Sequence, residues 1–182
     1  MSVDWDDYEP YHPGIDRPLD ELPRKEALAA YERMMASKAE RIEALERLLR
    51  ANGIAFDDGS DESIQALNEW FRRELEPDPE DQGAPDPQWF AVVHDVGMYL
   101  GDLIVERAPT VEWRFFDEDK REMAYQHPVL MGFDVPNPNY NVDVPWAVNL
   151  YAHRLLNDAA EGEDDYFVQV VEWSVAKAPR PG

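Results

Sequence analysis

The middle of the chain, residues 86–106, reads DPQWFAVVHDVGMYLGDLIVE. Asp86 followed by Pro87 is a typical helix start, because an Asp side chain caps free backbone amides and Pro suits the first helical position. Apolar residues then lie on nearly every side of the expected helix, which ends near Glu106. A helix that is apolar all round is normally buried. We therefore expect residues 86–106 to form the central helix of the fold.

Two glycines in this stretch predict close packing. Gly97 and Gly101 are four positions apart, so they share one face of the helix. Because Gly has no side chain beyond its hydrogen, a neighbouring element can approach the backbone there. We interpret the pair as a packing notch.

A polar stripe follows the same helix, formed at helical spacing by Asp95, Tyr99, Asp102 and Glu106. Carboxylates near a Tyr and near His94 could bind a ligand or perform acid–base catalysis if they faced a cleft. The alternative is a solvated face, because acidic side chains usually stay hydrated. The sequence favours the solvated face and leaves Asp95, Tyr99 and Asp102 as candidate ligand-binding residues.

Two further helices are expected within residues 23–75. Along the first, apolar residues recur every seven positions, at Leu28, Met35, Ile42 and Leu49. Gly53 then favours a helix end with a left-handed residue, and a second apolar-patterned segment reaches residue 75. The two segments predict a helical hairpin. The long first helix is also compatible with a dimeric coiled coil, although Lys38 lies in its apolar seam.

The C-terminal half, residues 88–182, mixes helix and strand patterns. We predict a β-hairpin from 110–116 and 122–126, a third strand at 129–133, a helix at 145–157 and a strand at 166–175. These elements do not alternate strictly as strand and helix, as they do in parallel α/β proteins. The predicted fold class is therefore α+β, with the N-terminal helical hairpin packed on a small, mostly antiparallel sheet and a central buried helix.

The chain is expected to form one compact domain with an arm and a linker. Residues 1–22 combine seven acidic residues with four Pro or Gly residues, which disfavour helix and strand. We interpret residues 1–22 as an acidic aromatic arm that packs on the body, with Trp5 and Tyr8 as candidate partner-binding residues. Residues 76–87 hold four Pro and five acids without a base, and so predict an exposed linker.

The composition is strongly acidic, with 39 Asp and Glu against 17 Lys and Arg and a net charge of −22. Such a charge repels phosphate backbones, so general nucleic-acid binding is disfavoured and basic protein partners are favoured. Runs without a base occur at 57–62, 74–86 and 158–165. The last run supplies further candidate partner-binding residues: Asp158, Glu161, Glu163, Asp164 and Asp165.

Residues 137–143, NPNYNVD, carry side-chain oxygens at alternate positions: Asn137, Asn139, Asn141 and Asp143. On an extended segment these oxygens would share one face and could bind Ca²⁺ or a polar ligand. The favoured alternative is a surface loop in which Asn side chains bond their own backbone.

Several classes of site and location are disfavoured by the sequence. The absence of Cys excludes disulfides and thiolate metal sites, and the four His residues lack metal-ligand spacing. Nucleotide-binding and hydrolase motifs are absent. We expect no cofactor and no metal. Neither an export signal nor a membrane-length apolar segment is present, which favours a cytoplasmic protein without membrane contacts.

The leading functional expectation is a non-enzymatic acidic interaction protein, such as an inhibitor or immunity-like neutraliser of a basic partner. One alternative is a small-ligand-binding or enzymatic domain that uses the Asp95, Tyr99 and Asp102 stripe. Another is a structural domain whose acidity serves only solubility. A homodimer through the long N-terminal helix is compatible with all three.

Overall fold

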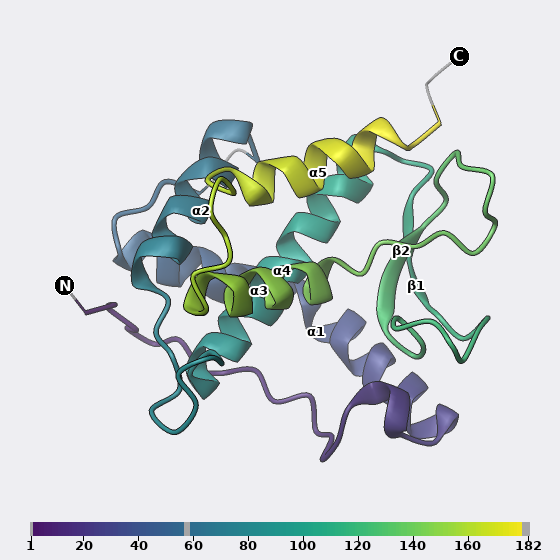
Figure 1. Ribbon diagram of the computed structural model, residues 1–182, viewed down its shortest axis with the longest axis horizontal. Helices are drawn as coiled ribbons and strands as arrows, with labels where there is room; N and C mark the ends of the chain where they lie inside the picture. The colour runs from purple at the N-terminus through teal and green to yellow at the C-terminus, as the bar shows by residue number, and fades with distance from the viewer. Residues whose placement is uncertain (1, 57–58, 180–182) are drawn as a thin grey trace.

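The fold is α+β, as the sequence predicted. The computed structural model describes residues 2–56 and 59–179. Within them lie a short 3₁₀ helix, five α-helices and two antiparallel strands (Figure 1). In chain order these are η1 (Leu19–Glu21), α1 (Arg24–Ala51), α2 (Asp61–Glu74), α3 (Pro87–Arg107), β1 (Glu112–Phe115), β2 (Pro128–Met131), α4 (Val144–Leu156) and α5 (Tyr166–Ala176).

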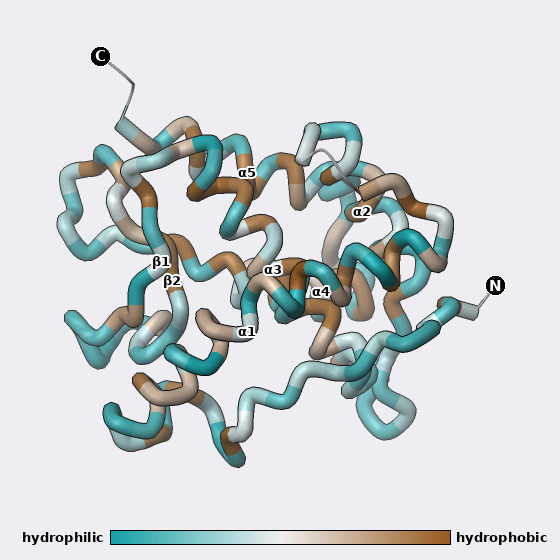
Figure 2. Tube along the Cα trace, turned by 180° about the vertical axis from the view of Figure 1, so that it is seen from behind, coloured by the Kyte–Doolittle hydropathy of each residue, from teal (hydrophilic) through white to brown (hydrophobic). Residues whose placement is uncertain are grey.

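Helix α3 is the centre of the molecule. It begins as predicted, because the Asp86 side chain accepts a hydrogen bond from the backbone amide of Gln88 at 2.9 Å. It packs against α1, α4, α5 and β1, and most of its side chains are buried. Figure 2 shows the hydrophobic segments gathered around it, with hydrophilic segments outside. The all-round apolar pattern of residues 86–106 thus correctly predicted a central helix.

Both glycines of α3 lie at close packing contacts, which confirms the predicted notch. A Cβ atom at Gly97 would lie 2.6 Å from the Cα of Pro145 in α4. One at Gly101 would lie 2.1 Å from the ring of Trp113 in β1. The two glycines therefore set how closely α4 and the sheet approach α3.

The variant Gly101→Ala is expected to lower the free energy of unfolding by about 1–3 kcal/mol, because overpacking must displace the Trp113 ring or the sheet. Urea unfolding followed by circular dichroism measures the change. Gly83→Ala is the matched control, since its added Cβ meets only side-chain atoms of Asn157 and Asp81 on a partly exposed loop. Equal stability of the two variants would contradict the packing role of Gly101.

Helix α1 ends as predicted. Gly53 adopts a left-handed conformation (φ 74°), and the amide of Ile54 donates to the carbonyl of Leu49 at 2.9 Å. This pair of features is the Schellman motif, which satisfies carbonyls at the helix end.

The inward face of α1 is apolar at both ends and basic in the middle. The buried apolar residues are Ala27, Ala30 and Met34 near the start and Ala44, Leu45, Leu48 and Leu49 near the end. Between these two groups, Lys38 pairs with Asp102 and Arg41 pairs with Asp95, both on α3. Two residues of the polar stripe of α3, Asp95 and Asp102, thus contact α1. The expectation of a solvated face is wrong for Asp95, which is fully buried.

Helices α1 and α2 follow one another in the chain as the predicted hairpin requires, but they pack mainly on other helices and not on each other. Helix α1 packs mainly on α3, whereas α2 packs on α5 and, through Trp70 and Phe71, on Trp89 of α3. The two helices therefore cover different sides of the same central helix. The cause is the location of the apolar partners, because α3 and α5 offer larger apolar faces than α1 and α2 offer each other.

The sheet forms from β1 and β2, and the predicted return strand at 122–126 is wrong. In the antiparallel register, Glu112 pairs with Met131 and Phe115 pairs with Pro128. Residues 117–127 form turns, and Gln126 is buried with a positive φ of 65°. Its side-chain amide donates to the carbonyls of Leu19 and Leu22. This buried polar anchor lies at the end of the turns, and the segment predicted as a third strand is the one that pairs with β1.

The segment predicted as a strand at 166–175 is helix α5. Its buried residues, Phe167, Val170, Val171 and Ser174, recur with the period of a helix. The β-branched and aromatic composition suits a strand, but such propensities are weak when packing favours another state. Packing of this face on α2 and α3 stabilises the helix and leaves Trp173 exposed.

The N-terminal arm lies along the body of the molecule (Figures 1 and 2). The ring of Trp5 contacts the ring of Trp89 with centroids 5.5 Å apart, and Tyr8 is buried. The backbone amide of Asp4 donates to the side chain of Asn52, whose amide donates back to the carbonyl of Asp4. These contacts fix the arm against α1 and α3.

No helix in the described part of the chain combines the length and the apolar character needed to cross a membrane.

Candidate functional site

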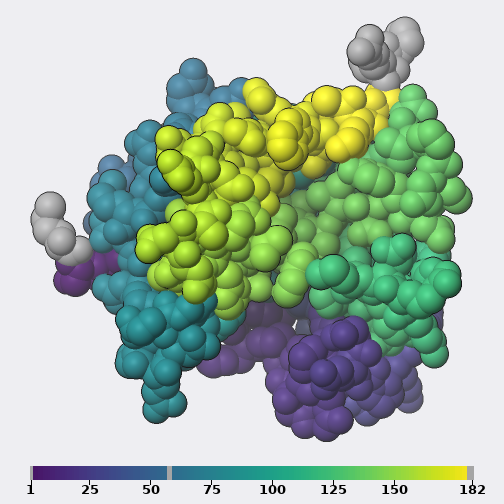
Figure 3. Space-filling model, in the orientation of Figure 1, coloured from purple at the N-terminus to yellow at the C-terminus, as the bar shows by residue number. Residues whose placement is uncertain are grey.

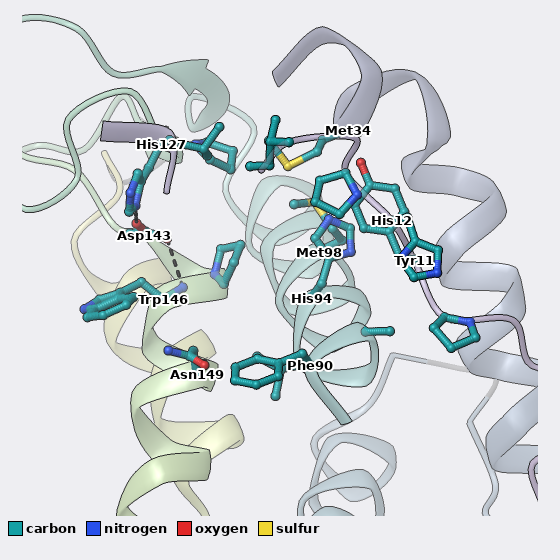
Figure 4. Close-up of a pocket in the computed structure, with 18 of the residues that line it drawn as sticks. Tyr11, His12, Met34, Phe90, His94, Met98, His127, Asp143, Trp146 and Asn149 are labelled. Atoms are coloured by element: carbon teal, nitrogen blue, oxygen red, sulfur yellow. Dashed lines mark hydrogen bonds and ion pairs between the residues drawn. The ribbon is translucent and has the colours of Figure 1, made fainter. Parts of the chain in front are cut away.

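The described residues line an open pocket of about 460 Å³ between the arm, α3, α4 and the start of β2. In Figure 3 the surface is hollowed where the N-terminal segment meets the middle of the chain. The lining is mostly apolar, and it also contains three of the four histidines (Figure 4). The side chains that bear on the chemistry are Tyr11, His12, Met34, Phe90, His94, Met98, His127, Asp143, Trp146 and Asn149.

One side of the pocket carries a histidine–carboxylate pair. Asp143 is the N-cap of α4, and its Oδ1 accepts a hydrogen bond from the amide of Trp146 at 3.0 Å. Its Oδ2 lies 2.6 Å from Nδ1 of His127, the residue before β2. Because a carboxylate accepts hydrogen bonds, Nδ1 of His127 is the donor, and in the neutral form of the ring Nε2 bears the lone pair. Helix capping and ring orientation are thus performed by one side chain.

The opposite side carries a second such pair. Nδ1 of His94 lies 3.0 Å from Oδ1 of the buried Asp95. Nε2 of His94 is buried and has no hydrogen-bond partner among the described residues. Both histidines therefore direct Nδ1 to a carboxylate, and Nε2 of neither ring makes a hydrogen bond to another residue that the structure describes.

The carboxylate of Asp95 is the centre of a buried hydrogen-bond network. Arg41 contacts both its oxygens, at 3.0 and 2.6 Å, and the Tyr8 hydroxyl donates to Oδ2 at 2.6 Å. Burial, and next the charge of Asp95, raise the pKa of Tyr8, so the phenol stays protonated and remains a donor. The network joins the arm, α1 and α3 and orients His94.

The arm supplies the third face of the pocket. The ring of Tyr11 stacks on the ring of His94, with centroids 4.2 Å apart and an angle of 17° between planes. The exposed His12 follows it at the rim. Because Tyr8 and Tyr11 are only three positions apart, the Asp95 network also fixes the arm segment that lines the pocket.

Apolar side chains form the rest of the wall. Met34 comes from α1 and Met98 from α3, and both are buried. Phe90 of α3 and Trp146 of α4 stand at the rim with 44% and 41% of their surfaces exposed. Exposed aromatic rings beside a concave apolar surface are typical of binding sites.

The three stripe residues predicted from the sequence have separate surroundings. Asp95 lies behind His94, whereas Asp102 accepts hydrogen bonds from Lys38 and from the indole of Trp113. Tyr99 is buried against Phe56, with ring centroids 4.2 Å apart. The structure therefore does not bring the three side chains to one cleft.

The four candidate residues of the loop at 137–143 do not share one site either. The amide of Asn139 donates to the side chain of Asn137, and the side chain of Asn141 donates to the carbonyl of Asn139. These are the local backbone bonds expected of a surface Asn loop. Of the four candidates, Asp143 alone lies in the pocket lining.

The acidic candidates lie on another part of the molecule, in the turn between α4 and α5. Asp158, Glu161, Asp164 and Asp165 are exposed. Glu163 pairs with Arg154, and Asp164 pairs with Arg72 while remaining largely exposed. Of the first acidic run, residues 57–58 lie outside the described residues. Trp5 and Tyr8, the arm candidates, contact the protein's own core.

The convergence of His12, His94 and His127 has no signature in the sequence. Their spacings are 82 and 33 positions, so only the fold brings them together. The one local signal is the Asp143-Val144-Pro145 helix start, because an N-cap carboxylate has a second oxygen free for another donor. Among the described residues, no group of three or more His, Asp or Glu side chains is arranged to hold a metal ion.

Comparison of the chain with protein-family models, with curated proteins and with solved structures found no match.

Proposed function

We propose that this protein binds a small, largely apolar molecule in the pocket between the arm, α3 and α4. The observation that carries the proposal is an apolar pocket with two histidines, each oriented by a carboxylate. Its volume of about 460 Å³ falls within the range of small-molecule sites. A few fixed polar groups on apolar walls are the usual composition of such sites.

The unengaged nitrogen of His94 gives independent support. A buried polar atom without a hydrogen-bond partner costs roughly 1–3 kcal/mol. Such atoms are rare in folded proteins, and a ligand group is one way in which they become satisfied. Nε2 of His94 belongs to a residue of the pocket lining. A bound molecule with a hydrogen-bond donor would remove this cost.

The fluorescent probe N-phenyl-1-naphthylamine, whose emission rises in apolar surroundings, tests the proposal. We expect saturable binding to the wild-type protein. The variant Asn149→Trp should weaken binding about tenfold or more, because the larger ring fills the pocket between α3 and α4. The side chain of Asn149 makes no hydrogen bond among the described residues and is half-buried, so stability should change little.

The matched control is Leu150→Trp on the same helix, because Leu150 is exposed and lies outside the lining. It should bind the probe as the wild type does. Failure of the wild type to bind the probe, or equal binding by both variants, would contradict the proposed site.

A second candidate function is association with a basic protein through the turn at 158–165. Four of its five candidate carboxylates are exposed, and the whole chain has a net charge of −22. Complementary charge speeds association and is screened by salt.

If this second function holds, neutralising Asp158 and Glu161 to Asn and Gln should slow the association of a basic partner captured from lysate several-fold at low salt. The melting temperature should stay the same or rise slightly, because like-charge repulsion is relieved. The control is Glu40→Gln with Glu43→Gln, the same charge change at exposed positions of α1. Equal association rates for both double variants would show that the turn is not the contact.

A further inference from the structure

The charges around the pocket discriminate between ligand classes. Among the described lining residues, none is Lys or Arg, and the carboxylate of Asp143 is present. The nearby guanidinium of Arg41 is engaged by Asp95 and by the carbonyl of Glu9. The guanidinium of Arg33 donates to the carbonyl of Pro13 beside the pocket. An anionic ligand would therefore meet no Lys or Arg in the lining itself, and the overall charge of −22 would repel it.

The histidine orientation also favours hydrogen-bond donors on the ligand. In both pairs the carboxylate accepts a hydrogen bond from Nδ1, at 2.6 Å for His127 and 3.0 Å for His94. In its neutral form each ring then offers the lone pair of Nε2, which accepts hydrogen bonds. The amide oxygen of Asn149 is a further acceptor in the lining. A ligand with N–H groups complements this set.

Aromatic rings complete the pattern. Tyr11, Phe90 and Trp146 line the pocket from the arm, α3 and α4 (Figure 4). The face of an aromatic ring attracts a cation, by about 0.5–1 kcal/mol at exposed sites and more where water is excluded. The aromatic rings, the Asp143 carboxylate and the negative net charge of the protein therefore all favour a positive charge on the ligand.

From these observations we infer that the ligand is an organic amine, with an apolar body and a protonated primary or secondary amino group that donates to Nε2 of His127. The inference rests on the proposed small-molecule site. The apolar body contacts Met34, Met98 and the rim aromatics, while the amino group lies between the two histidine–carboxylate pairs.

Three probes of equal chain length test the ligand class: octylamine, octan-1-ol and octanoate, measured by calorimetry at physiological salt. Octylamine should bind about tenfold or more tightly than octanoate, with octan-1-ol between them. Asn149→Trp retains every surface charge, so it should lose octylamine binding if the amine occupies the pocket. Undiminished binding by this variant would place the amine on the acidic surface and overturn the inference.

The variant Asp143→Asn tests the hydrogen-bond direction. Asn caps helices about as well as Asp, so α4 should remain stable. Its side-chain amide would donate to Nδ1 of His127 and shift the ring proton to Nε2, which then donates instead of accepting. Octylamine affinity should fall about fivefold to tenfold, while octan-1-ol, which can accept as well as donate, should lose less.

The outcomes separate the two proposals. Absence of binding by all three probes would contradict the site itself. Binding of octanoate or octan-1-ol as tight as that of octylamine would retain the site and overturn the amine inference. An unchanged octylamine affinity in Asp143→Asn would also overturn it.

Discussion

The variant Asp95→Ala is expected to lower the free energy of unfolding by about 3–5 kcal/mol, the cost of removing one partner from a buried ion pair. Asp95 is fully buried, and its loss would leave the Arg41 guanidinium without its carboxylate. The Tyr8 hydroxyl and Nδ1 of His94 would lose the same partner. Urea unfolding monitored by tryptophan fluorescence measures the change.

The matched control is Asp102→Ala, two turns further along α3. Its side chain is about one-third exposed, at 36%, and it pairs with a Lys that has its own access to water. Such pairs contribute less, so we expect a loss of about 1–2 kcal/mol, including the lost bond from Trp113. If Asp95→Ala costs no more than Asp102→Ala, the Asp95 network does not hold the arm, α1 and α3 together.

A chain of residues 88–182 alone is expected to lose cooperative folding and to aggregate. Removing α1, α2 and the arm would expose the face of α3 that they cover. Trp89 would lose its contacts with Trp5, Trp70 and Phe71. Exposing these apolar surfaces to water removes the burial and the packing contacts that stabilise a single core.

Size-exclusion chromatography and near-ultraviolet circular dichroism of residues 88–182 check this prediction. Addition of residues 1–75 in trans should restore part of the native signal, because the missing surfaces are supplied. A monomeric 88–182 fragment with cooperative unfolding and the stability of the full chain would instead show two independent domains.

The helices with local signals could be predicted from the sequence. Helix α3 begins at Asp86 and α1 ends before Gly53, as predicted, because capping and left-handed conformations depend on adjacent residues. The glycine notch on α3 was predictable for the same reason. The identity of the packing partners, Pro145 and Trp113, was not, because it depends on the tertiary arrangement.

Elements whose state depends on distant contacts were mispredicted. The residues of α5 suit a strand by composition, and only packing on α2 and α3 selects the helix. Similarly, the interruption before β2 follows from the burial of Gln126 beneath Leu19 and Leu22, more than a hundred positions away. A single sequence carries no local signal for such contacts.

In the candidate site, too, only the features with local signals could be predicted from the sequence. Asp143 was selected from the sequence, although as part of a loop that could bind Ca²⁺ or a polar ligand, and it lies in the pocket as the partner of His127. Lys38 was correctly noted as unusual in an apolar seam, but its partner Asp102 is 64 positions away. The pairing of His94 with the adjacent Asp95 could have been considered, whereas the burial of that pair by Tyr8 and Arg41 required the fold.

Amide chemical-shift mapping of nitrogen-15-labelled protein, during titration with N-phenyl-1-naphthylamine, tests ligand binding in the pocket most directly. We expect the largest shifts at residues 10–15 of the arm, at 90–98 of α3 and at 143–149 around the start of α4, because these segments line the pocket. The same shifts should be lost in Asn149→Trp and retained in Leu150→Trp. Shifts confined to the turn at 158–165, or none at saturating probe, would contradict the proposed site.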